Sequence, residues 1–318
     1  MKATARAHPN IALIKYWGKR NRELNLPAVP SLSLTLDQYH TTTTVEWGVE
    51  KDEVTLNRMV LGGQSKTRVL QFLDRVWGPN RPPVAVESQN NFPTAAGLAS
   101  SSSGFAALTL AASTAANKTC SKTELSILAR QGSGSACRSL WGGWVVWPRG
   151  IARDGTDSHG KPLAPKTHWD VRMLVAIIAS GPKPMSSTNA MIHTEQSSAL
   201  YAGWTAAADA DLKVAQTAVL ARDLPTLGTV MEESTLRMHA TMMSAQPSVR
   251  YWTPQTLMVM DAVEALRASG TPAYYTMDAG PNVKVLCEAH NADHIAKSIQ
   301  KLCERVDILK AGPDACLC

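Results

Sequence analysis

The sequence NFPTAAGLASSSSGFAAL, residues 91–108, places a turn rich in glycine and serine directly before an alanine-rich segment. Pro93 and Gly97 favour a turn, four hydroxyls follow at residues 100–103, and residues 105–116 have a composition that favours a buried helix. Free backbone N–H groups and the positive end of the helix dipole then face the turn. This pattern predicts a site for an anion such as phosphate, where serine hydroxyls add hydrogen bonds or a ligand for magnesium.

A structural loop can have the same pattern, so this stretch alone leaves both interpretations open. The turn is not a Walker A loop, because no Gly-Lys-Ser/Thr follows it, and the chain contains no Gly-x-Gly-x-x-Gly. Lysines and arginines for a bound polyphosphate must therefore come from other parts of the chain.

The composition is typical of a compact globular protein. Of its 318 residues, 44% are hydrophobic and 18% are charged, which indicates a large core and no extended disorder. The formal net charge of +6 suits an anionic partner. Because the basic residues are spread along the chain and do not form a run, we expect no nucleic-acid binding.

Cysteines and apolar segments bear on the cellular compartment. The six cysteines form no Cys-x-x-Cys and no zinc-type spacing, so reduced thiols are expected. The N-terminal sequence MKATARAHPN has no apolar leader, and the longest aliphatic run, residues 173–179, is too short to cross a bilayer. We expect a soluble, cytoplasmic protein with no membrane partner.

Hydrophobic periodicity predicts a first half rich in strands and a second half rich in helices. Strands are expected at residues 11–14, 41–47, 54–56, 84–88, 141–147, 171–179, 274–277 and 283–287. Residues 26–36 are expected to form a half-buried strand that exposes serine hydroxyls on one face. Helices are expected at residues 66–77, 105–116, 121–131, 197–222, 225–243, 255–268 and 291–305. Residues 151–167 are polar and rich in glycine and proline, as in a linker or long loop.

Residues 7–20, AHPNIALIKYWGKR, join a short apolar strand to a basic and aromatic tail. Lys15, Tyr16 and Lys19 follow the strand directly, so the end of the strand can present them to a ligand. An edge strand that is protected from aggregation by lysines has the same pattern.

Residues 132–139, GSGSACRS, form a second polar turn. Its glycines let the backbone approach a ligand closely, Ser133 and Ser135 offer hydroxyls, and the planar guanidinium of Arg138 suits a carboxylate or phosphate. A helix-to-strand loop whose arginine pairs with a surface acid is the structural alternative.

Two further polar turns lie in the second half of the chain. Residues 180–191, SGPKPMSSTNAM, are rich in hydroxyls and precede a long helical region. Residues 278–282, DAGPN, lie between two short apolar strands and predict a hairpin. An aspartate at such a turn commonly caps its own backbone, so Asp278 taken alone has a structural explanation.

Four of these segments, AHPNIALIKYWGKR, NFPTAAGLASSSSGFAAL, GSGSACRS and MDAGPNVKVL, closely resemble diphosphomevalonate decarboxylases of the GHMP kinase superfamily in both sequence and order. The resemblance covers almost the whole chain. It implies a two-domain α+β fold, with an N-terminal ATP-binding domain like ribosomal protein S5 domain 2 at residues 1–167. A ferredoxin-like α/β domain at residues 168–318 follows, with the active site in the cleft between the two. The resemblance also implies a homodimer.

The resemblance implies an ATP- and Mg²⁺-dependent reaction of the mevalonate pathway of isoprenoid biosynthesis. In it, (R)-mevalonate 5-diphosphate and ATP give isopentenyl diphosphate, ADP, phosphate and CO2. Asp278 matches the carboxylate that helps the 3-hydroxyl attack the γ-phosphate, either as a general base or as an orienting group. Lys15 matches the lysine beside that carboxylate, and Arg138 matches the arginine that grips the substrate carboxylate during elimination.

The other matching residues divide between the two substrates. Those that match the binding site for mevalonate 5-diphosphate are Asn10, Tyr16, Lys19, Ser133, Ser135, Ser187 and Met191. Those that match the ATP site are Ser88, Pro93, Ala95, Ala96, Gly97, Leu98, Ala99, Ser100 and Ser101, with Ser100 as the candidate Mg²⁺ ligand. The chain departs from some bacterial members, which have an arginine where this chain, like the eukaryotic-type enzymes, has Thr188.

Two alternatives lie within the same superfamily and one outside it. Phosphomevalonate decarboxylases use the monophosphate, and mevalonate 3-kinases phosphorylate the same hydroxyl without decarboxylation. Because the kinases lack the catalytic pair, Lys15 and Asp278 argue against that alternative. A non-catalytic RNA-binding protein with an S5-like domain is the third, and it predicts basic and aromatic residues on one face and an incomplete catalytic set.

Overall fold

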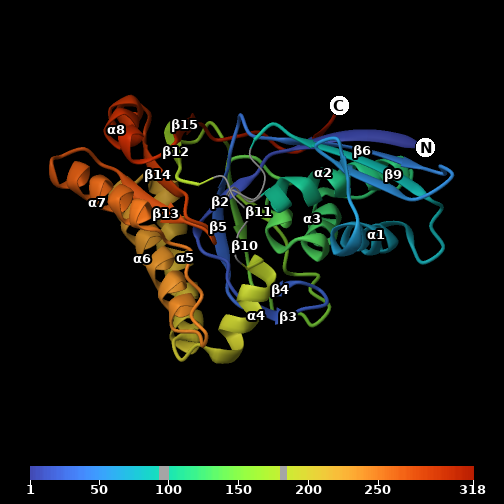
Figure 1. The fold of residues 1–318 in the computed structure, drawn as a ribbon, viewed down its shortest axis with the longest axis horizontal. Coiled ribbons are helices and arrows are strands. Elements are labelled where there is room, and N and C mark those ends of the chain that lie inside the picture. Colours follow the sequence, from blue (N-terminus) through green and yellow to red (C-terminus); the bar gives the residue numbers. More distant parts are fainter. Residues whose placement is uncertain (93–99, 180–184) are drawn as a thin grey trace.

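The computed structural model describes residues 1–92, 100–179 and 185–318, which fold into an N-terminal and a C-terminal half joined by a central sheet (Figure 1). In the N-terminal half the outer sheet has six strands in the order β16 (Cys316–Leu317), β1 (Lys2–Ala7), β6 (Thr41–Trp47), β9 (Val84–Asn90), β7 (Glu53–Leu56) and β8 (Met59–Val60). Burial alternates along β6, as expected for a strand with one face on the core.

Three helices share a hydrophobic core with this outer sheet. They are α1 (Gly63–Trp77), α2 (Ser100–Ala115) and α3 (Lys122–Gly132). The core between helices and sheet is built largely of small side chains on α2, together with Val45, Phe72 and Phe105. A capping box starts α3, because Ser121 and Glu124 bond to each other's backbone N–H groups as the sequence predicts.

The central sheet has the strand order β11 (Lys161–Ala164), β10 (Trp144–Trp147), β5 (Ser31–Thr35) and β2 (Asn10–Ile14). Every residue of β5 and β2 is buried, because α5 (Tyr201–Ala221) and α6 (Leu224–Met243) of the C-terminal half pack against this sheet. The expectation that residues 26–36 expose serine hydroxyls is therefore wrong.

The sheet of the C-terminal half has four antiparallel strands in the order β13 (Tyr274–Met277), β14 (Val283–Glu288), β12 (Val171–Ile177) and β15 (Arg305–Leu309). With helices between β12 and β13 and between β14 and β15, this is the ferredoxin-like order that the sequence implied. One face packs on α7 (Pro254–Ala268) and α8 (Ala292–Ile299), and the other contributes to the core shared with α5, α6 and the central sheet.

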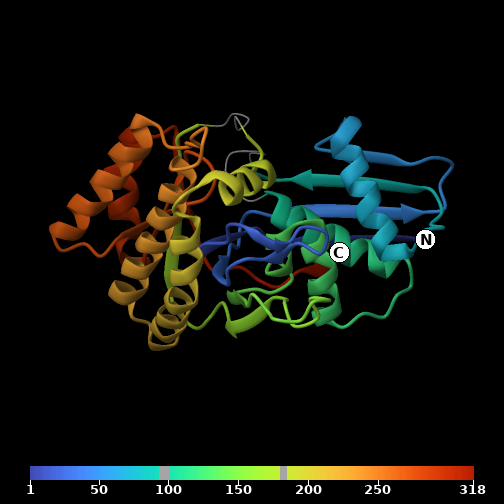
Figure 2. The same cartoon turned by 90° about the horizontal axis from the view of Figure 1, so that it is seen from below.

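Figure 2 shows the long helices of the C-terminal half on one side and the outer sheet with α1 on the other. Helix α4 (Ser187–Ser197) lies between them in this view. The short strands β3 (Lys19–Asn21) and β4 (Leu26–Pro27) pair with each other, and a 3₁₀ turn, η1 (Gly134–Cys137), follows α3. No helix among the described residues is long and apolar enough to cross a membrane.

Several boundaries differ from those expected. Helix α2 begins at Ser100, so the serine run forms its first turn and not the loop before it. The helix expected at residues 197–222 corresponds to α5, and an additional helix, α4, begins at Ser187 inside the segment expected to be a turn. The last helix ends at Ile299, without a side-chain cap from Asn291, and β15 follows where a helix was expected to reach residue 305.

Candidate active site

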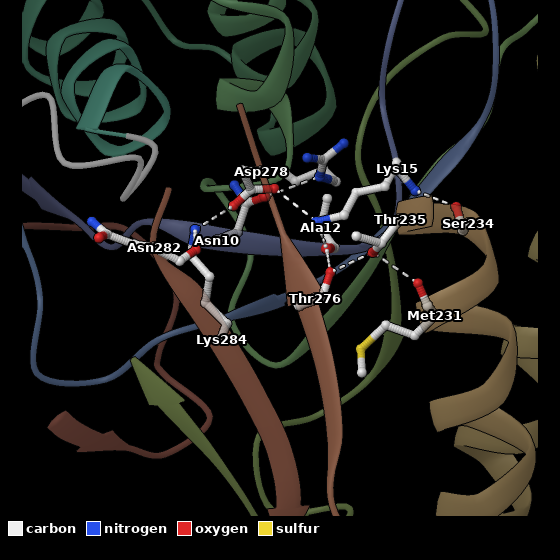
Figure 3. Close-up of polar contacts among 11 residues, drawn as sticks. Asn10, Ala12, Lys15, Met231, Ser234, Thr235, Thr276, Asp278, Asn282 and Lys284 are labelled. Carbon is white, nitrogen blue, oxygen red and sulfur yellow. Dashed lines mark hydrogen bonds and ion pairs between the residues drawn. The ribbon is translucent and has the colours of Figure 1, made fainter. Parts of the chain in front are cut away.

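An ion pair joins the end of β2 to the end of β13. Lys15 follows β2 directly, and its Nζ lies 2.9 Å from Oδ1 of Asp278, which follows β13 directly. The Lys15 side chain is 1% exposed and that of Asp278 is 23% exposed. Lys15 Nζ also donates to the carbonyl of Ala12 at 2.8 Å, and the Lys15 backbone N–H donates to Ser234 Oγ on α6 at 3.0 Å (Figure 3).

A second lysine contacts the same carboxylate. Lys284 lies on β14 and is fully buried, and its Nζ lies 3.3 Å from Oδ2 of Asp278. No sequence motif predicted a role for Lys284. The signal was a single lysine in the otherwise apolar stretch VKVLC, residues 283–287.

The two lysines determine the charge of the carboxylate. Burial favours the neutral acid and raises the pKa of Asp278, but the charges of Lys15 and Lys284 outweigh it and hold the pKa well below its usual value. Burial lowers the pKa of Lys15 to about 8, against the attraction of Asp278. At neutral pH the site therefore presents an ionised carboxylate next to a cation that loses its charge within reach of physiological pH.

Arg138 lies beside this pair in a network with Asn10. Its Nε donates to Asn10 Oδ1 at 3.0 Å, and Asn10 Nδ2 donates to Ser139 Oγ at 2.8 Å and to the carbonyl of Ser135 at 3.1 Å. Arg138 is buried, donates to Ser31 Oγ, and its guanidinium lies 5.6 Å from the ring centre of Trp147. The network fixes the plane of the guanidinium.

The two polar turns of the N-terminal half meet at their serines. Ser133 Oγ donates to Ser101 Oγ at 3.2 Å, which joins the C-terminal end of α3 to the first turn of α2. Ser100 is the first residue of α2. Pro93, Ala95, Ala96, Gly97, Leu98 and Ala99 lie outside the described residues.

Ser88 lies within the outer sheet, on β9. Its hydroxyl bonds to Thr43 Oγ1 on β6 at 2.8 Å, and its carbonyl accepts from the N–H of Asn57. No described contact joins Ser88 to the start of α2.

Tyr16 and Lys19 lie between the central sheet and the second polar turn. The Tyr16 ring packs on Trp147 at 4.7 Å, and its buried hydroxyl has no hydrogen-bond partner among the described residues. Lys19 Nζ donates to Asn25 Oδ1 at 2.6 Å. Burial and the nearby charges of Arg68 and Arg22 lower the pKa of Lys19 to about 8.

Helix α4 supplies the two remaining predicted residues. Ser187 is its first residue, and Met191 is one turn further along and buried in a cluster with Trp17 and Trp204. The apolar side of α4 thus packs against the chain segment that carries Tyr16 and Lys19.

Comparison with known families also divides the chain into an N-terminal and a C-terminal part. A family model described as the diphosphomevalonate decarboxylase-like N-terminal domain matches residues 7–160, and one described as the mevalonate 5-diphosphate decarboxylase C-terminal domain matches residues 173–315. The chain belongs to the diphosphomevalonate decarboxylase family. The predicted domain boundary between residues 167 and 168 falls in the interval between the two matches and stays a prediction.

Other members of the diphosphomevalonate decarboxylase family are similar over the whole chain. The diphosphomevalonate decarboxylase of Gibberella zeae is 35% identical over 333 residues, which cover 98% of this chain and 87% of that protein. The mevalonate diphosphate decarboxylase structure from Enterococcus faecalis superposes with a TM-score of 0.93 at 41% identity, and covers 100% of this chain and 99% of that one.

A further solved structure is described as MDDEF in complex with MVAPP, AMPPCP and magnesium. It superposes with a TM-score of 0.94 at 42% identity, and covers 100% of this chain and 99% of that one. The two-domain α+β fold of the GHMP type is confirmed by these structural matches.

Proposed function

We propose that this chain catalyses the ATP- and Mg²⁺-dependent decarboxylation of (R)-mevalonate 5-diphosphate to isopentenyl diphosphate, with release of ADP, phosphate and CO2. The observation that carries the proposal is the buried Lys15–Asp278 ion pair, which lies beside Arg138 where the two halves of the chain meet. A solved relative at 42% identity is described with MVAPP, an ATP analogue and magnesium.

In this proposal Asp278 accepts a hydrogen bond from the tertiary 3-hydroxyl of the substrate. A carboxylate with so low a pKa accepts a hydrogen bond but binds a proton weakly, so we infer that it mainly orients O3 toward the γ-phosphate. Lys15 offsets negative charge as the phosphoryl group moves to O3.

Arg138 serves the second half of the reaction. Once O3 carries phosphate, the phosphate leaves with its bonding electrons as the C–C bond to the carboxylate breaks and CO2 departs. The planar guanidinium, fixed by Asn10 and lying near Trp147, suits a two-point grip on that carboxylate. It thereby holds the breaking bond in position for elimination.

The start of α2 fits the phosphates of ATP. This helix has 16 residues and no acidic residue in its first turn, so its dipole and the N–H groups of that turn favour an anion there. Ser100 and Ser101 add hydroxyls, and Mg²⁺ accepts such oxygens together with phosphate oxygens and water. Bound Mg²⁺ supplies charge compensation for the phosphates, with Ser100 as the proposed protein ligand.

Basic and hydroxyl groups fit the diphosphate of the substrate. We assign this role to Lys19, Tyr16, Ser135 and Ser187, with Asn10 and Ser133 near the reacting groups and Met191 packing beside them. The hydroxyl of Tyr16 supports the assignment, because a buried hydroxyl without a partner among the described residues is costly unless a ligand satisfies it.

The test is a stoichiometric assay of the purified chain with ATP, Mg²⁺ and mevalonate 5-diphosphate. We expect ADP and CO2 in equal amounts, and the loss of both when EDTA removes Mg²⁺. Hydrolysis of ATP at the same rate without mevalonate 5-diphosphate would contradict the proposal.

A further inference from the structure

We propose that Lys284 is a positioning residue for this reaction, which acts through Asp278 by holding its Oδ2 atom while Lys15 holds Oδ1. The inference rests on the proposed function and extends it to a residue beyond those matched in the sequence.

The hairpin of β13 and β14 brings Lys284 to the carboxylate. Thr276 pairs with Lys284 across the hairpin and Met277 pairs with Val283, so Asp278 lies at the end where the chain turns back. Lys284 Nζ donates to the carbonyl of Asn282 at 3.3 Å and lies 3.3 Å from Asp278 Oδ2. One hairpin therefore supplies both the acid and one of its cations, and Figure 3 shows Lys15 reaching the same carboxylate from β2.

Complete burial of the Lys284 ammonium group costs free energy that its contacts must offset. The residues beside it on β14, Val283 and Val285, are fully buried, and so is Lys284 itself. An ammonium group in such surroundings persists when an anion and hydrogen-bond acceptors compensate the lost hydration. Asp278 supplies that anion, and in return each carboxylate oxygen has a cation from a different element.

Contacts at both oxygens restrain rotation of the carboxylate. A carboxylate that is held by Lys15 alone can turn about its terminal bond and misalign the bound hydroxyl. The hydrogen bond from Lys15 and the ion pair with Lys284 restrain this rotation, and accurate positioning of a reacting group contributes much of the rate of such reactions.

The charged and titratable groups that face Asp278 in the described part of the chain come from four elements. They are Lys15 after β2, Lys284 on β14, Arg138 after η1 and His239 on α6. Burial, and then the charge of Lys15, lowers the pKa of His239 to about 3, so this imidazole is neutral near pH 7. Removal of the Lys284 charge therefore leaves Lys15 and Arg138 as the neighbouring cations.

The test compares Lys284→Met with Lys284→Arg and with Lys297→Met, an exposed lysine on α8. We expect Lys284→Met to lower kcat about tenfold and to change KM for mevalonate 5-diphosphate less than about twofold. The pKa of the Asp278 carboxyl, followed by NMR titration, is expected to rise by about 1–3 pH units, the usual effect of losing one close opposite charge. Lys284→Arg should keep the Asp278 pKa of the unmodified chain, and Lys297→Met should change neither kcat nor this pKa.

The proposal is overturned if Lys284→Met keeps the kcat and the Asp278 pKa of the unmodified chain. It is also overturned if the Met and Arg variants lose activity equally with no change in that pKa, since packing then explains the loss. Lys284→Gln is measured in the same way if the Met variant does not fold.

If the unmodified chain shows no activity, the proposed function is wrong, and the role of Lys284 is then tested on its own. In that case NMR titration of the Asp278 carboxyl, assigned with Asp278→Asn, decides the role of Lys284. A pKa that rises in Lys284→Met supports the proposal, and an unchanged pKa contradicts it.

Discussion

Asp278 lies between two lysine ammonium groups that come from opposite ends of the chain. Replacement by alanine should abolish ADP and CO2 release together, because phosphorylation precedes elimination. We expect a loss in kcat of about 10² or more, the usual effect of misplacing a reacting group. Both products are followed in a single-turnover assay, with the exposed Asp261→Asn on α7 as the control. Normal turnover in Asp278→Ala would show that the carboxylate has another role.

The lowered pKa of Lys15 predicts that activity falls at alkaline pH. Burial lowers its pKa to about 8, and the charged form is the active one, so kcat/KM should fall as the pH rises through about 8. The pKa of Lys19 is also lowered to about 8, so a matched pair of variants is needed. Lys15→Arg should shift the limb to higher pH in the activity that remains, since arginine keeps its charge, while Lys19→Arg should leave the limb in place. The opposite pattern would assign the limb to Lys19.

The sequence predicted some residues of the site and missed others. Lys15 and Asp278 were expected to lie together because both matched family motifs, and their contact agrees with that expectation. Lys284 was missed, because a lysine in a strand is usually exposed and its burial depends on how β13, β14 and the central sheet pack. The assigned roles of all these residues stay predictions until the variants are measured.

At the scale of elements, the end of α3 packs closely against the helices beside it. A Cβ on Gly132 would lie 2.2 Å from Phe105 Cδ1 and 2.9 Å from Phe72 Cδ2. Gly132→Ala should therefore destabilise the protein by about 1–3 kcal/mol, the usual cost of overpacking a core. It should also weaken ATP binding, because Ser133 is the next residue and contacts Ser101.

Gly203→Ala provides the matched control for that prediction. Gly203 is exposed on α5, and a Cβ there meets no described atom within 4 Å, so we expect unchanged ATP binding and a stability gain of up to about 1 kcal/mol. Urea unfolding and nucleotide titration measure the two effects. Equal stability of the two variants would contradict the packing argument.

Local signals predicted many elements well. The strands at residues 41–47 and 274–277 and the capped helix after Ser121 have the expected bounds or lie within a residue of them. Burial of β5 could not be predicted, because its leucines pack in the core shared with α5 and its serines are also buried, with Ser31 accepting a hydrogen bond from the distant Arg138. Likewise, the short strand β15 was not predicted, and the helix before it was expected to reach residue 305 because no clear breaker follows Ile299, where α8 ends.

At the scale of the whole molecule, one core crosses from one half of the chain to the other. Ile11 and Leu34 of the central sheet belong to the same buried cluster as Met173 on β12 and Leu227 on α6. The strand β16 also pairs with β1, so the last described strand lies in the sheet that contains the first. One packed core thus holds together β2 and β13, the two strands that Lys15 and Asp278 directly follow.

A homodimer is the predicted assembly of the whole molecule. It came from resemblance to the family, and we propose it on that ground. Light scattering coupled to size-exclusion chromatography should give a mass of about twice 34.2 kDa over a range of concentrations. A constant mass near that of one chain would contradict the prediction.

A paired assay of the purified protein with ATP and Mg²⁺ tests whether the chain decarboxylates mevalonate 5-diphosphate. Mevalonate 5-diphosphate is offered in one reaction and mevalonate 5-phosphate in the other, and ADP and CO2 are followed in both. We predict equal amounts of ADP and CO2 from the diphosphate and neither product from the monophosphate. Both products from the monophosphate alone, or ADP without CO2 from the diphosphate, would contradict the account.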